Sequence, residues 1–331
     1  MSFIFFNSFQ RMMGDTNIQH IPTGGVDALW IAGGQGTGNT LAYSTDGIVW
    51  TGLTKNIFSS VGIGVAYSAK QNRWVAAGNG SGVNSLAYSM DGINWSGRGN
   101  SIFSAAGFGA AYSEKQDRWV AAGSGTVHTL AYSMDGINWS GRGISIFSTQ
   151  GQGVAYSASQ NCWVAAGQGT GNTLAYSTDG ITWTGLGKPF SIAGRSVAYS
   201  ASQNRWVAGG SGTGNTLAYS SDGINWIGRG NSIFSGIGYG VDYSASQNRW
   251  VAGGSGGNTL AYSSDGFNWT GLGNSIFING GYGVAYSAFQ DRWTAGGQGG
   301  NTLAYSSDGI NWTGLGNSIF SGYGLGIAYT R

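Results

Sequence analysis

The sequence predicts an all-β protein that folds as a closed seven-bladed β-propeller with four antiparallel strands in each blade. Three observations lead to this prediction. A unit of 43 to 45 residues recurs seven times, each unit contains short β-favouring stretches between Gly-rich turns, and the incomplete first and last units complement each other. A four-stranded unit of about this length is typical of a propeller blade.

The repeat is marked most clearly by the motif Ser-x-Asp-Gly-x-x-Trp, which first occurs over residues 44–50. All fourteen Trp residues belong to the repeat, since seven end this motif and seven open runs that resemble "WVAAG". The aspartates of the motif are Asp46, Asp91, Asp135, Asp179, Asp222, Asp265 and Asp308. We expect the propeller to cover residues 26–331, after an N-terminal extension over residues 1–25.

One unit illustrates the four strands of a blade. The first strand is predicted at 64–68, the second at 73–78, the third at 85–89 and the fourth at 93–97. Asp91-Gly92 joins the third strand to the fourth, and Asp-Gly between β-favouring residues is a strong hairpin signal. The strands are apolar or small on both faces, as expected for sheets that are stacked face to face.

The two ends of the repeat region complete one blade between them. The first unit lacks a first strand and begins at 28–34, whereas the last unit ends with an extra first strand at 326–330. We therefore expect the C-terminal strand to pair with the N-terminal blade. This pairing closes the ring and removes exposed sheet edges.

Composition excludes several classes of protein. The net charge of +2 without a basic stripe argues against a nucleic-acid partner. No apolar run approaches the length of a membrane span, so membrane insertion is not expected. Cys162 is the single cysteine, which excludes an intramolecular disulfide framework. The N-terminus does not resemble a signal peptide, so an intracellular or particle-associated location is expected, with the location otherwise unknown.

Ser44, Asp46, Gly47 and Trp50, together with their six sets of counterparts, resemble the Asp-box, or bacterial neuraminidase repeat, of β-propellers. That family's usual form is Ser-x-Asp-x-Gly-x-Thr-Trp, one residue longer than the motif here. The resemblance covers residues 28–331 and implies a propeller with the motif on the hairpin between the third and fourth strands.

The same resemblance raises the question of sialidase activity. Sialidases of this kind use an arginine triad, a Tyr-Glu nucleophile pair and an Asp acid/base. This chain has one glutamate, Glu114, and eight of its eleven arginines occupy two repeated positions. We therefore expect no catalytic residues, no glycosidase or sialidase activity, and no enzyme function.

The seven motif aspartates could be calcium ligands or structural turn residues. A turn Asp accepts backbone N–H bonds, whereas calcium needs six or more oxygen ligands from a denser cluster, so the structural role is favoured. His20, His128 and Cys162 do not form a metal-ligand spacing. We expect no metal and no cofactor.

One position just before the first strand varies freely while its surroundings barely change. It is occupied by Ile63, Phe108, Gln152, Arg195, Tyr239, Tyr282 and Leu325. In a propeller this position lies on the face formed by the loops between the second and third strands and between blades, near the central channel. The loops of that face carry small polar residues, including Asn39, Asn172 and Asn215. Either the fold tolerates many residue types at this position and the sequence drifts there, or the variable residues form a ligand-binding rim.

The functional hypothesis is a non-enzymatic, lectin-like scaffold that binds carbohydrate on this face. Aromatic rings can pack against sugar C–H groups while amides bond the hydroxyls. The alternative is a structural or assembly protein, for example a particle component, that binds other proteins. Asp242 replaces the usual Ala in a first strand, and we expect it to pair or share water with Arg195.

Overall fold

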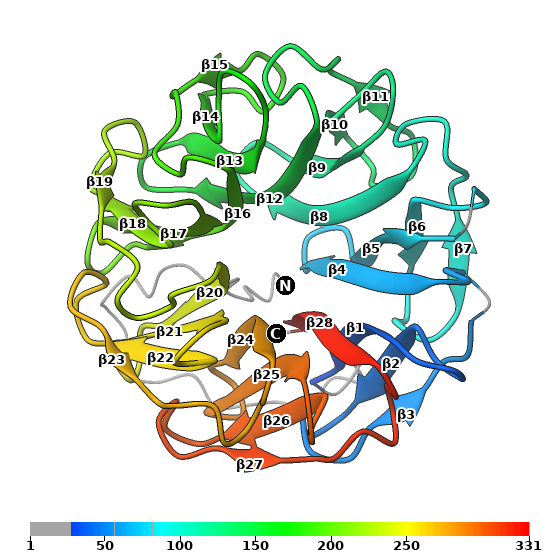
Figure 1. Cartoon of the computed structure of the whole chain (residues 1–331). Helices are drawn as coiled ribbons and strands as arrows, with labels where there is room; N and C mark the ends of the chain where they lie inside the picture. Colours follow the sequence, from blue (N-terminus) through cyan, green and yellow to red (C-terminus); the bar gives the residue numbers. More distant parts are fainter. Residues whose placement is uncertain (1–27, 56, 81, 331) are drawn as a thin grey trace, which may run out of the picture.

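The computed structural model describes residues 28–55, 57–80 and 82–330. These residues form seven four-stranded antiparallel sheets arranged in a ring (Figure 1), which confirms the predicted all-β seven-bladed propeller. No helix in the described ranges is long and apolar enough to cross a membrane. The predicted extension over residues 1–25 and its boundary with the propeller lie outside the described residues.

Each blade runs from an innermost strand to an outermost strand. Blade 1 has the order β28-β1-β2-β3, and blades 2 to 7 follow in chain order, each with four consecutive strands. The innermost strands are β4 (Val61–Ser68), β8 (Ala106–Ser113), β12 (Gln150–Ser157), β16 (Ala193–Ser200), β20 (Gly238–Ser244), β24 (Gly280–Ser287) and β28 (Tyr323–Tyr329). The second strands are β1 (Trp30–Gln35), β5 (Arg73–Asn79), β9 (Arg118–Ser124), β13 (Cys162–Gln168), β17 (Arg205–Ser211), β21 (Arg249–Gly254) and β25 (Arg292–Gln298).

The two outer strands of each blade are shorter. The third strands are β2 (Leu41–Ser44), β6 (Leu86–Ser89), β10 (Leu130–Ser133), β14 (Leu174–Ser177), β18 (Leu217–Ser220), β22 (Leu260–Ser263) and β26 (Leu303–Ser306). The fourth strands are β3 (Thr51–Gly52), β7 (Trp95–Gly97), β11 (Ser140–Gly141), β15 (Thr184–Gly185), β19 (Ile227–Gly228), β23 (Thr270–Gly271) and β27 (Thr313–Gly314).

The chain ends close the ring in blade 1, as predicted. β28 pairs antiparallel with β1, with Trp30 opposite Tyr329. The N–H of Leu29 donates to Thr330 Oγ1 at 2.6 Å, and the N–H of Thr330 donates to the carbonyl of Leu29 at 2.7 Å. The last strand of the chain is therefore held in the first blade by both sheet and side-chain hydrogen bonds.

In blade 2, two predicted strand boundaries were wrong by more than one residue, each for a local reason, and two others differ by a single residue. The innermost strand of blade 2 begins at Val61 rather than residue 64, because Val61 pairs with Asn79 beyond a β-bulge. The fourth strand of that blade begins at Trp95 rather than residue 93. The N–H groups of Ile93 and Asn94 bond to the Asp91 carboxylate instead of to the sheet.

The core is a set of seven layers between neighbouring blades. The Trp that opens each second strand is at most 1% exposed, and the third strands contribute buried Leu and Ala. In each blade the Tyr of the innermost strand packs across from this Trp, with ring centroids 4.7 to 5.1 Å apart. The apolar character of both strand faces is explained by this burial on both sides.

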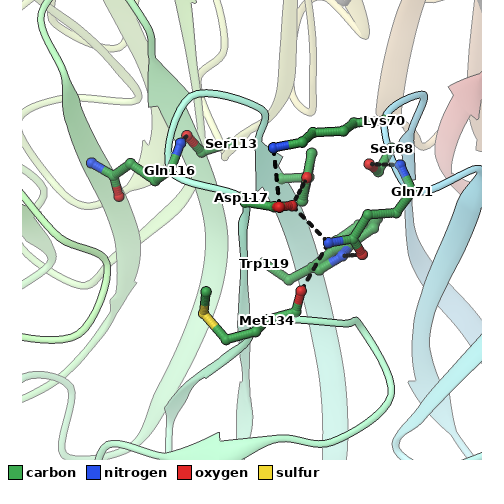
Figure 2. A network of polar contacts seen from close by, with 9 residues as sticks. Ser68, Lys70, Gln71, Ser113, Gln116, Asp117, Trp119 and Met134 are labelled. Atoms are coloured by element: carbon green, nitrogen blue, oxygen red, sulfur yellow. Dashed lines mark hydrogen bonds and ion pairs between the residues drawn. The ribbon is translucent and has the colours of Figure 1, made fainter.

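In each of blades 2 to 7, a glutamine from the turn after the innermost strand ties the blade to the next one. Gln71 accepts a hydrogen bond from Trp119 Nε1 and donates to Asp117 Oδ1 and to the carbonyl of Met134 (Figure 2). The residues that contact the next Trp in the same way are Gln71, Gln116, Gln160, Gln203, Gln247 and Gln290. The buried indole N–H groups are thereby satisfied across blade boundaries.

Candidate ligand-binding site

The motif aspartates are engaged within their own turns. Asp46 Oδ1 accepts hydrogen bonds from Ser44 Oγ at 2.9 Å and from the N–H groups of Ile48 and Val49 at 2.8 Å each. Trp50 Nε1 donates to the carbonyl of Gly47 at 3.2 Å. Gly47 has a φ of +73°, a conformation that glycine adopts without strain. The other six turns repeat the bonds from the Ser hydroxyl and the two N–H groups to the Asp carboxylate.

These bonds also set the acidity of the turns. Burial of Asp91 opposes its ionisation, but hydrogen bonds from Asn94, Ile93 and Ser89 outweigh burial and lower the pKa of Asp91 to about 2. Nowhere in the described ranges do three His, Cys, Asp or Glu side chains lie close enough together to hold a metal ion.

The repeated arginines also contact the next blade. Arg73 donates to the carbonyl of Asp135, and its guanidinium carbon lies 5.8 Å from the ring centroid of Tyr88. Arg98 lies 5.9 Å from the same ring and donates to the carbonyl of Ile137. The arginines that donate to a backbone carbonyl of the following blade are Arg73, Arg98, Arg118, Arg142, Arg205, Arg229, Arg249 and Arg292.

The three predicted asparagines are part of a structural clamp. Asn172 Oδ1 accepts from the N–H of Gly187 at 2.9 Å, and its Nδ2 donates at 3.3 Å to the carbonyl of Ile146, in the loop between blades 3 and 4. Asn39 and Asn215 make the equivalent pairs of contacts. Because both ends of each amide are used, we leave these asparagines out of the site proposed below.

The seven variable residues form a ring on the innermost strands, which we call the inner rim. Its members are Ile63, Phe108, Gln152, Arg195, Tyr239, Tyr282 and Leu325. The sequence suggested a position just before the strand, but each residue lies inside it. In every blade the register between the first and second strands shifts at this residue, which is the mark of a β-bulge. All seven are half-buried.

The inner rim is held by close backbone contacts between neighbouring innermost strands. A Cβ added to Gly64 would lie 2.3 Å from the carbonyl oxygen of Phe108, so only glycine fits there. Ser196 occupies the equivalent position in blade 5, and its hydroxyl donates to the carbonyl of Tyr239. The blade that carries Arg195 is thus joined to its neighbour by a side-chain bond rather than by a glycine contact.

Three tyrosines gather on one sector of the rim. The rings of Tyr239 and Tyr282 meet edge to face with centroids 4.8 Å apart, and Tyr282 and Tyr323 are 5.9 Å apart. The hydroxyl of Tyr282 donates to Gln298 Oε1 at 2.8 Å. Tyr323 and Gln298 were missed by the sequence reasoning, although Tyr323 stands where blades 2, 3 and 5 have Val61, Ala106 and Ala193. An aromatic residue at a position where other blades have Val or Ala could have marked Tyr323 as a candidate site residue.

The expected contact of Asp242 with Arg195, by pairing or through shared water, stays a prediction. Asp242 Oδ2 accepts a hydrogen bond from the N–H of Tyr286 in the next blade at 2.8 Å. Arg195 Nε is buried and has no hydrogen-bond partner within the described part of the chain. Burial lowers the pKa of Arg195, with a smaller opposing effect from Tyr239.

A separate cavity of about 190 Å³ lies between the outer strands of blades 1 and 2. Its lining is formed by Thr40, Leu41, Leu53, Thr54, Ile57, Ile93, Asn94 and Trp95. None of these side chains can act as an acid or base near neutral pH, and none belongs to the inner rim. The cavity therefore offers no general acid–base chemistry of its own.

No protein-family model matches the chain, and no curated protein matches it either. Solved structures do match. A protein from Lactobacillus plantarum is 12% identical with a TM-score of 0.64, over 92% of this chain and 99% of its own. Streptogramin B lyase is 7% identical with a TM-score of 0.62, over 76% of this chain and 81% of its own. YCF48 bound to the D1 peptide is 17% identical with a TM-score of 0.54, over 79% of this chain and 83% of its own.

At these identities the comparisons show the fold alone. They nevertheless correct one expectation. We expected the protein not to be an enzyme, but a lyase has the same fold, so the architecture does not support that exclusion. Propellers of this shape also bind protein partners, as the complex of YCF48 with the D1 peptide illustrates.

Proposed function

We propose that this protein binds a carbohydrate at the tyrosine sector, which we define as the rim residues Tyr239 and Tyr282 together with the neighbouring Tyr323. The observation that supports the proposal most directly is the contact of these three rings beside the Gln298 amide. A sugar recognised here would pack its C–H face against a ring and bond its hydroxyls to the amide and phenol groups.

The repeated architecture supports the proposal in a second way. The seven Ser-x-Asp-Gly turns, which we infer to be a shortened Asp-box, have their carboxylates and hydroxyls occupied by local bonds. They lie at the opposite ends of the strands from the inner rim. The positions that vary between blades are therefore separated from those that maintain the fold.

A protein partner is the second candidate. Two exposed apolar side chains, Ile192 and Ile278, lie in the loops that lead into β16 and β24 on the same face, and they are 51% and 60% exposed. Exposed apolar groups of this kind suit a protein interface when they occur together. In this case the tyrosine sector would be the centre of the interface.

A glycan array with the full chain tests the proposal. We expect at least one glycan to bind, with single-site affinity near ~1 mM and a gain of roughly 10²–10⁴ on a multivalent surface. Tyr282→Phe, which removes only the hydroxyl bonded to Gln298, should weaken binding, and Tyr239→Ala should weaken it further. Mass spectrometry of the glycan after incubation would show whether it is also chemically changed.

The matched control is Phe289→Ala. Phe289 is an aromatic residue that is 68% exposed in the turn between β24 and β25, on the opposite face. This variant should bind as tightly as the parent protein. Absence of binding to every glycan, or equal loss in the Phe289 and Tyr239 variants, would contradict the proposal.

A further inference from the structure

Arg195 stands apart from the other arginines of the propeller. Eight described arginines donate to a backbone carbonyl of the following blade. Arg195 makes no such bond within the described residues. Its Nε is buried without a partner, as are those of Arg73 and Arg118, but Arg73 and Arg118 donate to a backbone carbonyl through Nη1. A guanidinium keeps its charge at any pH that a protein tolerates, so this residue holds a positive charge at the inner rim.

Arg195 is half-buried, so its charge is partly removed from water. Burying a charged group without a hydrogen-bonded partner destabilises the folded state. The other rim positions carry neutral residues, namely Ile63, Phe108, Gln152, Tyr239, Tyr282 and Leu325. A bulge residue can be replaced by any of these, so the fold itself does not require arginine here.

Arg195 also lies next to the tyrosine sector. It lies on β16, the innermost strand of the blade before that of Tyr239, and Ser196 bonds to the Tyr239 carbonyl. Burial lowers the pKa of Arg195, and the nearby Tyr239 phenol opposes part of this effect. A ligand on the tyrosine sector would therefore have the guanidinium beside it, whose fork of N–H donors matches a carboxylate or a sulfate.

From these observations we infer that the ligand is an anionic carbohydrate, whose carboxylate or sulfate group is bound by Arg195 while its sugar ring packs on Tyr239. This inference rests on the proposed carbohydrate-binding function and adds the chemical class of the ligand. Arg195 supplies the hydrogen bonds and charge that specify an acidic sugar. The tyrosines supply contact area that any sugar could use.

The test is an array of matched glycan pairs, each containing an acidic glycan and its neutral counterpart. One useful pair is an oligogalacturonate and its methyl ester, which differ only in the blocked carboxylate. Sulfated glycans and their unsulfated forms provide the second arm. We expect the full chain to bind at least one acidic glycan about tenfold more tightly than its neutral partner, because a charge-assisted bond is worth about that factor.

Three variants separate the explanations. Arg195→Gln should abolish the preference for the acidic form, and Arg195→Lys should keep part of it. Lys188→Gln removes the same charge from an exposed position in the loop between β15 and β16 and should keep the full preference. Without ligand, Arg195→Gln should unfold at the same or a higher temperature than the parent protein, because it removes an unpaired charge.

The outcomes distinguish this inference from the function on which it rests. Binding of neutral and acidic forms with equal affinity would overturn the inference and leave carbohydrate binding standing. An acidic preference that survives in Arg195→Gln would overturn it as well. Binding of no glycan at all would overturn the proposed function itself.

Discussion

Trp119 Nε1 donates a hydrogen bond of 2.9 Å to Gln71 Oε1 across the boundary between blades 2 and 3 (Figure 2). The same Gln71 amide donates to Asp117 and to the carbonyl of Met134 in the following blade. One side chain therefore satisfies a buried indole and joins two turns of its neighbour. This relationship recurs around the ring and explains why the glutamine hardly varies in a sequence whose rim varies freely.

Removing one glutamine should weaken a blade boundary. Gln203 is the clearest case, since it bonds to Trp250 Nε1, Asn248 Oδ1 and the carbonyl of Ser264. Gln203→Ala should lower the free energy of unfolding by about 1–3 kcal/mol, because the buried Trp250 N–H loses its acceptor. Urea unfolding of the variant and of the parent protein measures this difference in the free energy of unfolding.

A conservative variant serves as the control. Gln203→Glu retains an acceptor for Trp250 but loses the two donated bonds, so it should be destabilised less than Gln203→Ala. If both variants unfold like the parent protein, the Gln203 hydrogen bonds between blades do not contribute to stability as argued.

Cys162 interrupts another repeated contact, the bond from an arginine to a backbone carbonyl of the next blade. It stands where neighbouring blades have Arg118 and Arg205. Its thiol is buried and free, with no disulfide bond. Burial raises the pKa of the Cys162 thiol to about 11, so it is protonated near neutral pH. Cys162→Arg should restore a bond to the carbonyl of Asp222 and contact with the Tyr176 ring, with a gain of about 1 kcal/mol.

The comparison that checks this prediction is Cys162→Lys. Lysine brings the same charge without the planar fork that bonds and stacks simultaneously. The midpoint of urea unfolding should therefore rise more for arginine than for lysine. Destabilisation by both would mean that blade 4 no longer has space for the long side chain.

The architecture could be predicted from the sequence because each blade corresponds to one sequence repeat. The Asp-Gly hairpins, the paired Trp positions and the complementary ends determine blade number, strand number and closure. The β-bulges were not predictable, since a bulge exists only in the register between two strands. The unpartnered Arg195 was also invisible, because the repeated arginines acquire their partners from the following blade.

The asparagines were predicted to be ligand-binding residues, although the structure uses them to hold loops together. Asn39, Asn172 and Asn215 looked like polar groups available to a ligand because they lie in small polar loops. Their partners are an N–H just after the fourth strand and a carbonyl in the loop between blades, and neither is apparent from the loop sequence. Polarity in a loop is therefore not a sign of availability to a ligand.

His128 replaces one of these asparagines and provides a further test. Its Nδ1 accepts from the N–H of Gly143 at 2.9 Å, which reproduces one half of the clamp. His128→Asn should restore the second half, a bond to the carbonyl of Ile102 in the loop between blades 2 and 3, and stabilise the protein by about 0.5–1.5 kcal/mol. The reciprocal variant Asn172→His should lose the bond to Ile146 and be destabilised by a similar amount. Equal stability of the parent protein and both variants would contradict this account of the clamp.

The seven Ser-x-Asp-Gly turns should make the fold sensitive to acid. The pKa values of Asp91, Asp135, Asp222 and Asp308 are lowered from 3.8 to about 2 by the turn hydrogen bonds, which outweigh burial. A carboxyl whose pKa is lower in the folded state stabilises the fold fully above the unfolded value. That contribution is lost as the pH falls through the folded value. The free energy of unfolding should therefore decrease between pH 4 and 2, as measured by urea unfolding at successive pH values.

Asp91→Asn isolates one turn of this set. Asparagine retains an oxygen for the N–H groups of Ile93 and Asn94 but lacks the charge, so it resembles the protonated aspartate. The variant should be less stable than the parent protein at pH 6, and the difference should shrink toward zero as the pH falls to about 2, the folded pKa of Asp91. A difference that stays constant over this range would show that the Asp91 charge contributes nothing to the turn and that the side chain acts through shape alone.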